Sequence, residues 1–243
     1  MNWFKDLYDD FRMKRTFGSV SDERTKQDVD FIIDVLNLPK GGKMLDLFCG
    51  LGRHSIELAE RGYNAVGIEY NSEYLKLARA KAQKKGVVIE FIHGDVRHVE
   101  FGVDYDAAII MYQSFGYFTD EEDKMVLHKI YNALKQNGRF LIEILSKDWI
   151  LNNFVENEVT EVNGIKIDET RAFDAPTSRV NFTINRHLEE GVVTKKGSWR
   201  LYSSSEITSI SDNIGFKYIA GYNDLDKNPL TKNTRLMHLV FEK

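Results

Sequence analysis

The stretch that decides the fold is MLDLFCGLGRH, residues 44–54. It begins with an apolar run typical of a buried parallel strand and then breaks at Gly50 and Gly52. Behind the break, residues 55–59 begin a helix that should stop at Gly62. This order brings backbone N–H groups and a helix N-terminus against a ligand, and a Cβ at the turn would block that approach. The stretch therefore predicts the ligand-binding turn of an α/β fold.

Two acidic residues sharpen this prediction. Asp46 lies inside the apolar run, where a carboxylate is costly unless it is hydrogen-bonded. Glu69 ends the next apolar run, residues 65–68, and an acid there can accept both hydroxyls of a ribose. The main alternative is a nicotinamide-binding turn, because residues 50–55 nearly fit G-x-G-x-x-G and Glu69 follows at the expected distance. Ser55 in place of the third glycine and the charge of Asp46 argue against that alternative.

Three segments together carry a family resemblance: LDLFCGLGRH at 45–54, GIEYN at 67–71 and FIHGD at 91–95. They resemble class I S-adenosylmethionine-dependent methyltransferases, in the small-molecule branch that includes glycine N-methyltransferase. The resemblance covers most of the chain, from about Arg24 onward, and is weakest in the middle. It implies S-adenosylmethionine as cofactor, S-adenosylhomocysteine as product, and in-line methyl transfer to a nitrogen or oxygen of a small molecule. A nucleic-acid or protein acceptor, or cofactor binding without transfer, are the alternatives.

The resemblance also implies which residues hold the cofactor. Glu69 would accept from the ribose, Asp95 and the backbone of Val96 would meet the adenine, and Tyr70 would lie flat against it. Arg24 stands where glycine N-methyltransferase-like enzymes carry an arginine that holds the methionine carboxylate. The predicted cofactor-binding residues are Tyr8, Arg24, Asp46, Cys49, Gly50, Gly52, Glu69, Tyr70, Asp95, Val96, Met111 and Gln113.

The rest of the chain predicts an α/β fold, a doubly wound Rossmann-like seven-stranded methyltransferase sheet whose last strand is antiparallel. Strands are expected at 44–48, 65–69, 87–93, 106–111, 139–145, 216–222 and 235–242. Alternating residues and the turn pairs Asn163–Gly164 and Glu190–Gly191 predict an inserted antiparallel β lobe. Residues 1–150 and 203–243 would then form the cofactor-binding domain, and residues 151–202 the lobe over the active site.

Catalytic candidates lie where the carboxyl ends of the strands should meet the lobe. Tyr117 belongs to an aromatic loop after the fourth strand, and Glu143 is a charge inside the fifth. Arg200 and Tyr202 precede the helix at which the lobe rejoins the sheet. Each is as readily structural as catalytic, because the sulfonium methyl is already activated and the enzyme mainly positions the reactants. No His, Cys or Asp spacing predicts a metal site.

Composition limits the partners and the compartment. The 243 residues carry a net charge of −4, which disfavours nucleic acid because proteins that grip it usually show a basic face. No apolar run is long enough for a membrane and no signal peptide is visible. The single cysteine, Cys49, fits the reducing cytoplasm. We expect a monomer or homodimer whose aromatic N-terminus, including Phe4 and Phe17, packs on the domain or covers the cofactor.

Overall fold

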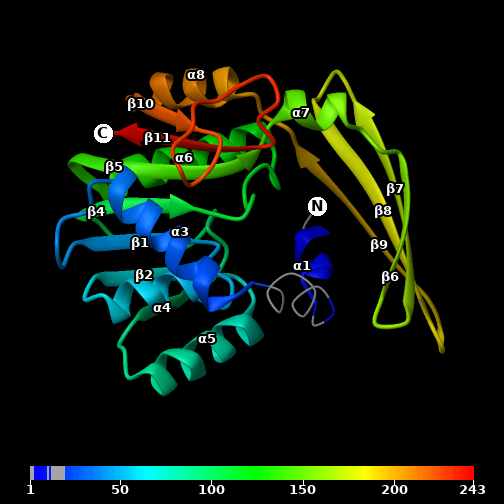
Figure 1. Ribbon diagram of the computed structural model, residues 1–243, viewed down its shortest axis with the longest axis horizontal. Coiled ribbons are helices and arrows are strands. Elements are labelled where there is room, and N and C mark those ends of the chain that lie inside the picture. Colours follow the sequence, from blue (N-terminus) through cyan, green and yellow to red (C-terminus); the bar gives the residue numbers. More distant parts are fainter. Residues whose placement is uncertain (1–2, 10, 12–19) are drawn as a thin grey trace.

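The computed structural model describes residues 3–9, 11 and 20–243, and these form two sheets that stand side by side (Figure 1). The larger sheet has seven strands in the order β10-β11-β5-β4-β1-β2-β3. Its strands are β1 (Lys43–Leu47), β2 (Asn64–Glu69), β3 (Glu90–His93), β4 (Tyr105–Ile110), β5 (Leu134–Leu145), β10 (Lys217–Tyr222) and β11 (Leu236–Glu242). Only β11 among them runs antiparallel to both of its neighbours, β5 and β10.

This strand order places a crevice at one edge of the sheet. The pairs β1–β2, β2–β3, β1–β4 and β4–β5 are parallel, and the order reverses between β1 and β4. Ligands of open α/β sheets bind beyond the carboxyl ends of the strands at such a reversal. The doubly wound sheet with an antiparallel last strand is therefore confirmed, and its crevice faces the second sheet, as the direction of the β4 arrow in Figure 1 shows.

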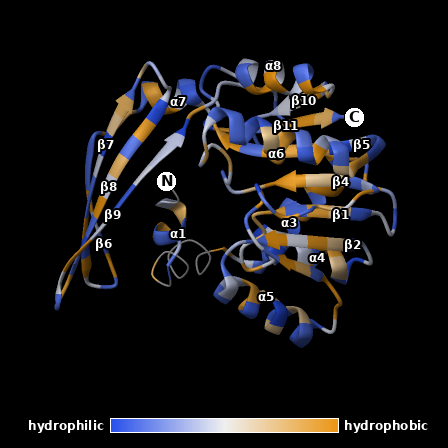
Figure 2. Cartoon of the chain, turned by 180° about the vertical axis from the view of Figure 1, so that it is seen from behind, coloured by the Kyte–Doolittle hydropathy of each residue, from blue (hydrophilic) through white to orange (hydrophobic). Residues whose placement is uncertain are grey.

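Helices cover both faces of the large sheet. One face carries α3 (Asp22–Val35), α4 (Arg53–Glu60) and α5 (Ser72–Lys85), and the other carries α6 (Asp120–Ala133) and α8 (Ser204–Ile214). The central strand β4 is largely hydrophobic, as its orange colour in Figure 2 shows. A strand buried on both faces needs such a continuous apolar run, which explains why residues 107–110 have no alternation.

The helix ends agree with the capping residues of the sequence. Ser21 caps α3, and Thr119 and Ser203 form capping boxes with Glu122 and Glu206 at the starts of α6 and α8. The predicted starts of two strands differ from the structure by more than one residue. Strand β3 begins at Glu90 rather than at 87, and β5 begins at Leu134 rather than at 139 because Leu134 already pairs with Tyr105 before an irregularity in the ladder.

The smaller sheet is the predicted insertion. After α7 (Lys147–Asn152) it contains β6 (Asn157–Val162), β7 (Ile165–Asp174), β8 (Arg179–Leu188) and β9 (Gly191–Arg200), all antiparallel. Asn163 and Gly164 both have positive φ, as a tight hairpin requires. The turn between β8 and β9 falls on Glu189–Glu190, one residue earlier than expected. The strands lie within residues 151–202, and the division into two domains stays a prediction. Within the described parts of the chain, no helix has the length and apolarity to cross a bilayer.

Helix α1 (Trp3–Leu7) lies between the two sheets (Figure 1). The Trp3 ring meets the edges of Phe182 on β8 and of Tyr117, each with ring centroids 5.4 Å apart. Gly197 on β9 makes room for this helix, because a Cβ there would lie 2.5 Å from the Trp3 ring. The aromatic N-terminus thus packs against both sheets; Phe17 lies outside the described residues.

Candidate cofactor and acceptor site

The glycine turn after β1 has the geometry that only glycine accepts easily. Gly50 and Gly52 have φ values of 57° and 70°, in the left-handed region. A Cβ on Gly52 would also lie 2.9 Å from the Phe91 ring. Gly52 is the N-cap of α4, so the turn delivers the N-terminus of that helix to the crevice.

Glu69 ends β2 beside this turn and is almost completely buried. Its carboxylate accepts the backbone N–H of Gly50 at 3.0 Å and that of Asn71 at 2.9 Å. Burial raises the pKa of Glu69 to about 7, against the effect of these hydrogen bonds. A carboxylate held in this way keeps lone pairs free for further donors, such as the two hydroxyls of a ribose.

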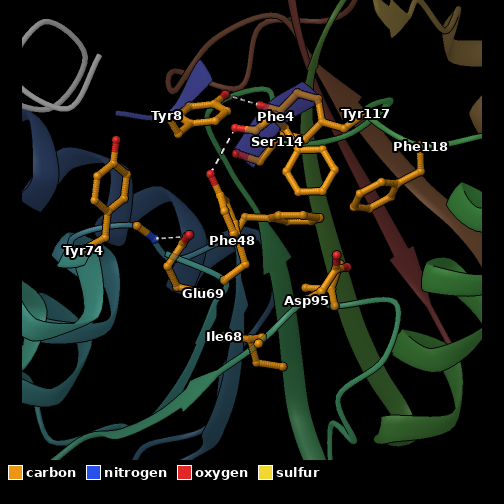
Figure 3. A pocket seen from close by; sticks show the side chains of 14 residues that line it. Phe4, Tyr8, Phe48, Ile68, Glu69, Tyr74, Asp95, Ser114, Tyr117 and Phe118 are labelled. Carbon is orange, nitrogen blue, oxygen red and sulfur yellow. Dashed lines mark hydrogen bonds between the residues drawn. The ribbon is translucent and has the colours of Figure 1, made fainter. Parts of the chain in front are cut away.

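A cavity opens directly in front of Glu69 (Figure 3). It encloses about 510 Å³ of empty space, part of it open to solvent. Its walls come from the ends of β1 and β2, the turn after β3, the loop after β4 and the N-terminal segment. The lining includes seven predicted site residues, Tyr8, Gly50, Glu69, Tyr70, Asp95, Val96 and Tyr117, together with Phe4, Phe48, Ile68, Tyr74, Gly94, Ser114 and Phe118.

Asp95 lies at the far wall of this cavity and is paired with Arg97. The Arg97 guanidinium donates from Nε to Oδ1 at 3.0 Å and from Nη2 to Oδ2 at 2.7 Å. Burial opposes ionisation, but these hydrogen bonds lower the pKa of Asp95 below its ordinary value. Oδ1 also accepts the backbone N–H of Arg97 at 3.1 Å, so Oδ2 is the oxygen that keeps a second lone pair for an amino group from the cavity.

The other side of the glycine turn holds a network of buried charges. Asp46 accepts the hydroxyl of Ser55 at 2.6 Å, which satisfies the carboxylate within the strand. Asp28 on α3 accepts from Arg24 at 2.8 Å and from Arg53 at 2.7 Å. Burial would raise the pKa of Asp28, but His54 and Arg53 together lower it to about 2. Arg53 Nη2 is buried and has no hydrogen-bond partner among the described residues.

A second and larger cavity lies between the strand ends and the inner face of the small sheet. It holds about 1810 Å³ of empty space including open solvent. Tyr112 and Gln113 after β4, Trp149 on α7, and Phe182 and Trp199 on the small sheet are among its walls. Tyr8 and Tyr117 line both cavities, and their hydroxyl oxygens are 2.5 Å apart (Figure 3). The two tyrosines therefore stand where the cavities meet.

The comparison with known proteins agrees with this geometry. Residues 44–138 match the family model described as "Methyltransferase domain". A crystal structure of an S-adenosylmethionine-dependent methyltransferase from Clostridium acetobutylicum has the same fold, with a TM-score of 0.79 at 18% identity over 99% of this chain and 98% of that one. Residues 44–138 are thus similar to a methyltransferase domain, and the whole chain has the fold of an S-adenosylmethionine-dependent methyltransferase of known structure.

Curated relatives of this chain differ in what their names say they do. A glycine/sarcosine N-methyltransferase from Halorhodospira halochloris is 30% identical over 54% of this chain and 50% of its own length. A carboxy-S-adenosyl-L-methionine synthase from Nautilia profundicola is 27% identical over 88% of this chain and 90% of its own length. The chain spans about half the length of the first curated relatives that it matches.

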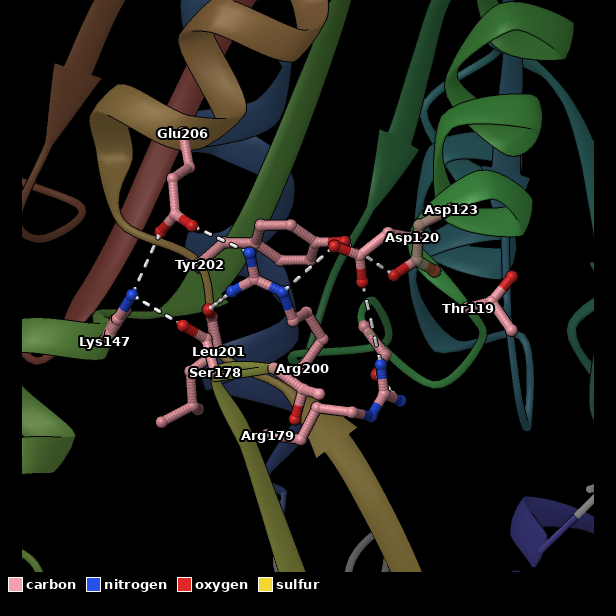
Figure 4. A network of polar contacts seen from close by, with 12 residues as sticks. Thr119, Asp120, Asp123, Lys147, Ser178, Arg179, Arg200, Leu201, Tyr202 and Glu206 are labelled. Atoms are coloured by element: carbon pink, nitrogen blue, oxygen red, sulfur yellow. Dashed lines mark hydrogen bonds and ion pairs between the residues drawn. The ribbon is translucent and has the colours of Figure 1, made fainter. Parts of the chain in front are cut away.

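Three of the four predicted catalytic residues have structural partners. Glu143 is buried and accepts the backbone N–H of Tyr112 at 2.9 Å, with His238 Nε2 at 3.2 Å. Tyr202 donates to Asp123 on α6 at 2.9 Å, and Arg200 pairs with Glu206 at 2.8 Å (Figure 4). These contacts favour a structural role for all three, although Arg200 and Tyr202 also line the larger cavity. Tyr117 alone lies beside the cofactor cavity, and its catalytic role stays a prediction.

Five predicted cofactor residues line neither cavity: Arg24, Asp46, Cys49, Gly52 and Met111. Met111 is packed in the core below α3, and Cys49 is buried beside Gly67, where burial raises the pKa of its thiol. Gln113 lines the larger cavity rather than the cofactor cavity. Gly52 and Asp46 shape the glycine turn from behind, so their contribution to cofactor binding would be indirect.

Sequence reasoning missed Arg97, and it named Phe4 only as part of an N-terminus that packs on the domain or covers the cofactor. Arg97 stands two residues after Asp95, a spacing that places its guanidinium on that carboxylate, so the motif itself contained a signal. Phe4 lines the cofactor cavity, and its carbonyl accepts the hydroxyl of Tyr70 at 3.0 Å. No local pattern predicts this contact, because it depends on the folding of the N-terminus across the crevice.

Proposed function

We propose that this protein transfers the methyl group of S-adenosylmethionine to a nitrogen or oxygen of a small molecule held in the larger cavity. The observation that carries the proposal is the junction of the two cavities at Tyr8 and Tyr117. The cofactor cavity has the Glu69 carboxylate, the glycine turn and aromatic walls, which suit an adenosine. The larger cavity has the small sheet as one of its walls. A methyl group at the junction could reach a nucleophile from the second side.

Residues of this chain are suited to each part of the cofactor. Glu69 would accept from the ribose hydroxyls, and Asp95 with the backbone of Val96 would meet the adenine. The methionine carboxylate would be held by Arg24 and Arg53, because Arg53 Nη2 is a buried donor without a partner among the described residues. Glu69 and Asp95 stand at the two positions where the family motif has an acidic residue.

The chemistry asks mainly for positioning and a dry site. The bound cofactor supplies a sulfonium methyl that is already activated for displacement. Phe4, Tyr8 and Tyr117 would exclude water and fix the direction of approach, which supports a reaction in which charge is lost from sulfur. A general base is needed only for a protonated nucleophile, and the Tyr117 hydroxyl is the nearest candidate at the junction.

A small acceptor is supported by the walls that the strand ends and the small sheet give to the larger cavity, and by the net charge of −4. The glycine/sarcosine N-methyltransferase relative points the same way. The small sheet would serve as the acceptor lobe over the active site. A cytoplasmic location and a monomer or homodimer remain predictions that accompany this function.

Two measurements in sequence test the proposal. Calorimetric titration should show that the wild type and Glu73→Ala, an exposed control on α5, bind S-adenosylhomocysteine. Glu69→Ala should lose on the order of 2–4 kcal/mol of this binding free energy. Wild-type protein is then incubated with S-adenosylmethionine and pools of small amines, phenols and carboxylates, and methylated products are detected by mass spectrometry.

The outcomes separate the alternatives. Methylated small molecules support the proposal. Cofactor binding without any methylated product, in the presence of these pools, RNA and protein extracts, would indicate a cofactor-binding protein. A carboxylated cofactor instead of a methylated acceptor would indicate the reaction named for the Nautilia profundicola relative. Binding of NAD in place of S-adenosylhomocysteine would overturn the assignment of the cofactor.

A further inference from the structure

The charges that line the larger cavity are unevenly partnered. Three arginines and two glutamates belong to its lining: Arg171, Arg200, Arg235, Glu158 and Glu169. A guanidinium that is already paired has little left to offer a ligand, because its fork-shaped donors are used. The question is therefore which of the three arginines is free.

Arg171 on β7 is fully occupied by the small sheet. Its Nε lies 2.8 Å from a carboxylate oxygen of Glu169, and its Nη2 lies 2.6 Å from one of Glu158. Nη1 faces the carbonyl of Val155. This cluster holds two carboxylates for one guanidinium, so the wall formed by β6 and β7 has no positive charge to offer.

Arg200 at the end of β9 also lines the cavity, but its guanidinium belongs to a network of polar contacts (Figure 4). Its Nη2 pairs with Glu206 at 2.8 Å and its Nε with Asp120 at 3.4 Å. Nη1 donates to the carbonyl of Leu201. The side chain ties the small sheet to α6 and α8, and its charge is balanced there.

Arg235 differs from both. It is exposed, lines the cavity just before β11, and has no ion pair with any described residue. Its guanidinium lies over the Trp149 ring, 5.1 Å from the centroid, which directs the group along the cavity wall. The backbone beneath it is fixed, because its carbonyl accepts the N–H of Ser146 at 2.9 Å. A guanidinium without an ion pair, carried on a hydrogen-bonded backbone and lying over an aromatic ring, is suited to a carboxylate or phosphate.

We infer that the acceptor carries an anionic group, a carboxylate or a phosphate, and that Arg235 binds it at the end of the cavity formed by α7 and β11. The inference rests on the proposed function and specifies its acceptor class. Arg235 is then a specificity-determining residue: it holds the acceptor by its anion while another atom of the acceptor meets the methyl group. The aromatic walls between would bind the body of the molecule.

The three tryptophans of the chain, Trp3, Trp149 and Trp199, all line this cavity, so their fluorescence reports on it directly. Stern–Volmer quenching by iodide, an anion, is compared with quenching by neutral acrylamide. The inference predicts that Arg235→Gln lowers the iodide slope about twofold and leaves the acrylamide slope unchanged. The matched control is Lys232→Gln, which removes an equally exposed charge from the same loop outside the cavity and should leave both slopes unchanged.

A second arm uses matched ligands on protein saturated with S-adenosylhomocysteine. Tyrosine is compared with tyramine, and glucosamine 6-phosphate with glucosamine, as protectors against acrylamide. At least one anionic member should protect at a tenfold lower concentration than its partner, and Arg235→Gln should abolish that advantage; which pair responds distinguishes carboxylate from phosphate.

An iodide slope that is the same in wild type and Arg235→Gln overturns the inference, as does equal or absent protection within both pairs. Failure of the proposed function gives a different result. It appears as absent binding of S-adenosylhomocysteine in calorimetry, while the comparison of iodide slopes needs no cofactor.

Discussion

The hydroxyl oxygens of Tyr8 and Tyr117 lie 2.5 Å apart, and this hydrogen bond joins the N-terminal segment to the loop after β4. The two residues are 109 positions apart in sequence. They meet at the junction of the two cavities, so the contact that orders the N-terminus also forms the boundary between them. This pair of side chains therefore affects both the access to the cofactor cavity and the shape of the larger cavity.

The tyrosine pair should show coupling in a double-mutant cycle. Tyr8→Phe and Tyr117→Phe each remove a hydroxyl, and the double variant should be about 0.5–1.5 kcal/mol more stable than the sum of the single effects predicts. Chemical denaturation measures the free energy of unfolding of the four proteins. A control cycle pairs Tyr8→Phe with Tyr63→Phe, far away on the turn before β2, and should be additive. Additivity in the first cycle as well would contradict the contact.

Binding of S-adenosylhomocysteine should depend on the ionisation of Glu69. Burial raises the pKa of Glu69 to about 7, and only the ionised carboxylate keeps all its acceptor sites for the ribose hydroxyls. Affinity should therefore fall about tenfold between pH 8 and pH 6. Glu69→Gln should bind more weakly and show a flat profile over the same interval. Calorimetry at four pH values decides, and a wild-type profile as flat as that of the variant would contradict the assignment.

Stability should fall as pH rises past the unfolded pKa of Asp123. Burial raises the pKa of Asp123 from 3.8 to about 7, against the hydrogen bond from Tyr202. Between these values the folded chain keeps a proton that the unfolded chain has released, so the free energy of unfolding decreases with rising pH. The loss is on the order of 3–4 kcal/mol by pH 8.

Asp123→Asn should remove this slope and unfold at higher temperature than the wild type at pH 8. At pH 4 the two proteins should be similar, because the wild-type carboxyl is then neutral. Glu121→Gln, an exposed change on the same helix, should follow the wild type at both values. Parallel melting curves for wild type and Asp123→Asn across this range would show that the buried carboxyl does not titrate as stated.

Gly197→Ala should loosen α1. The added Cβ would lie 2.5 Å from the Trp3 ring and would also meet Phe182, and such overpacking costs about 1–3 kcal/mol. Hydrogen exchange at residues 3–9 should accelerate and affinity for S-adenosylhomocysteine should drop, since Phe4 and Tyr8 line its cavity. Lys196→Ala places an alanine on the opposite face of the same strand and should change neither quantity. Unchanged exchange in Gly197→Ala would contradict the packing described.

Local sequence signals predicted most of this fold. The glycine turn and the capping boxes at Thr119 and Ser203 act within a few residues, so a local stretch of sequence contains the whole interaction. The antiparallel lobe followed from alternation and turn residues in the same way. The early start of β5 at Leu134 did not, because it depends on pairing with Tyr105, which is far away in sequence.

The site was less predictable because its residues come from distant segments. Asp95 was expected to meet the adenine together with the backbone of Val96, and its partnership with Arg97 uses side-chain geometry that periodicity does not describe. Arg200 and Tyr202 were placed correctly at the return of the lobe, but their partners Glu206 and Asp123 lie on helices packed behind it. Arg235 carried no motif, and only the fold brings it to a cavity with Trp149.

The lobe enters and leaves the large sheet at almost the same point. Ser146 and Tyr202 form a parallel bridge, and the N–H of Lys147 donates to the carbonyl of Tyr202 at 3.2 Å. Residues 147–201 therefore make an excursion whose two ends are neighbours. A module of a different size could be grafted between those ends without disturbing β5 or α8, since the closing distance stays fixed. If the small sheet determines the acceptor, evolution or protein engineering could thus change the acceptor while the cofactor cavity at the large sheet stays the same.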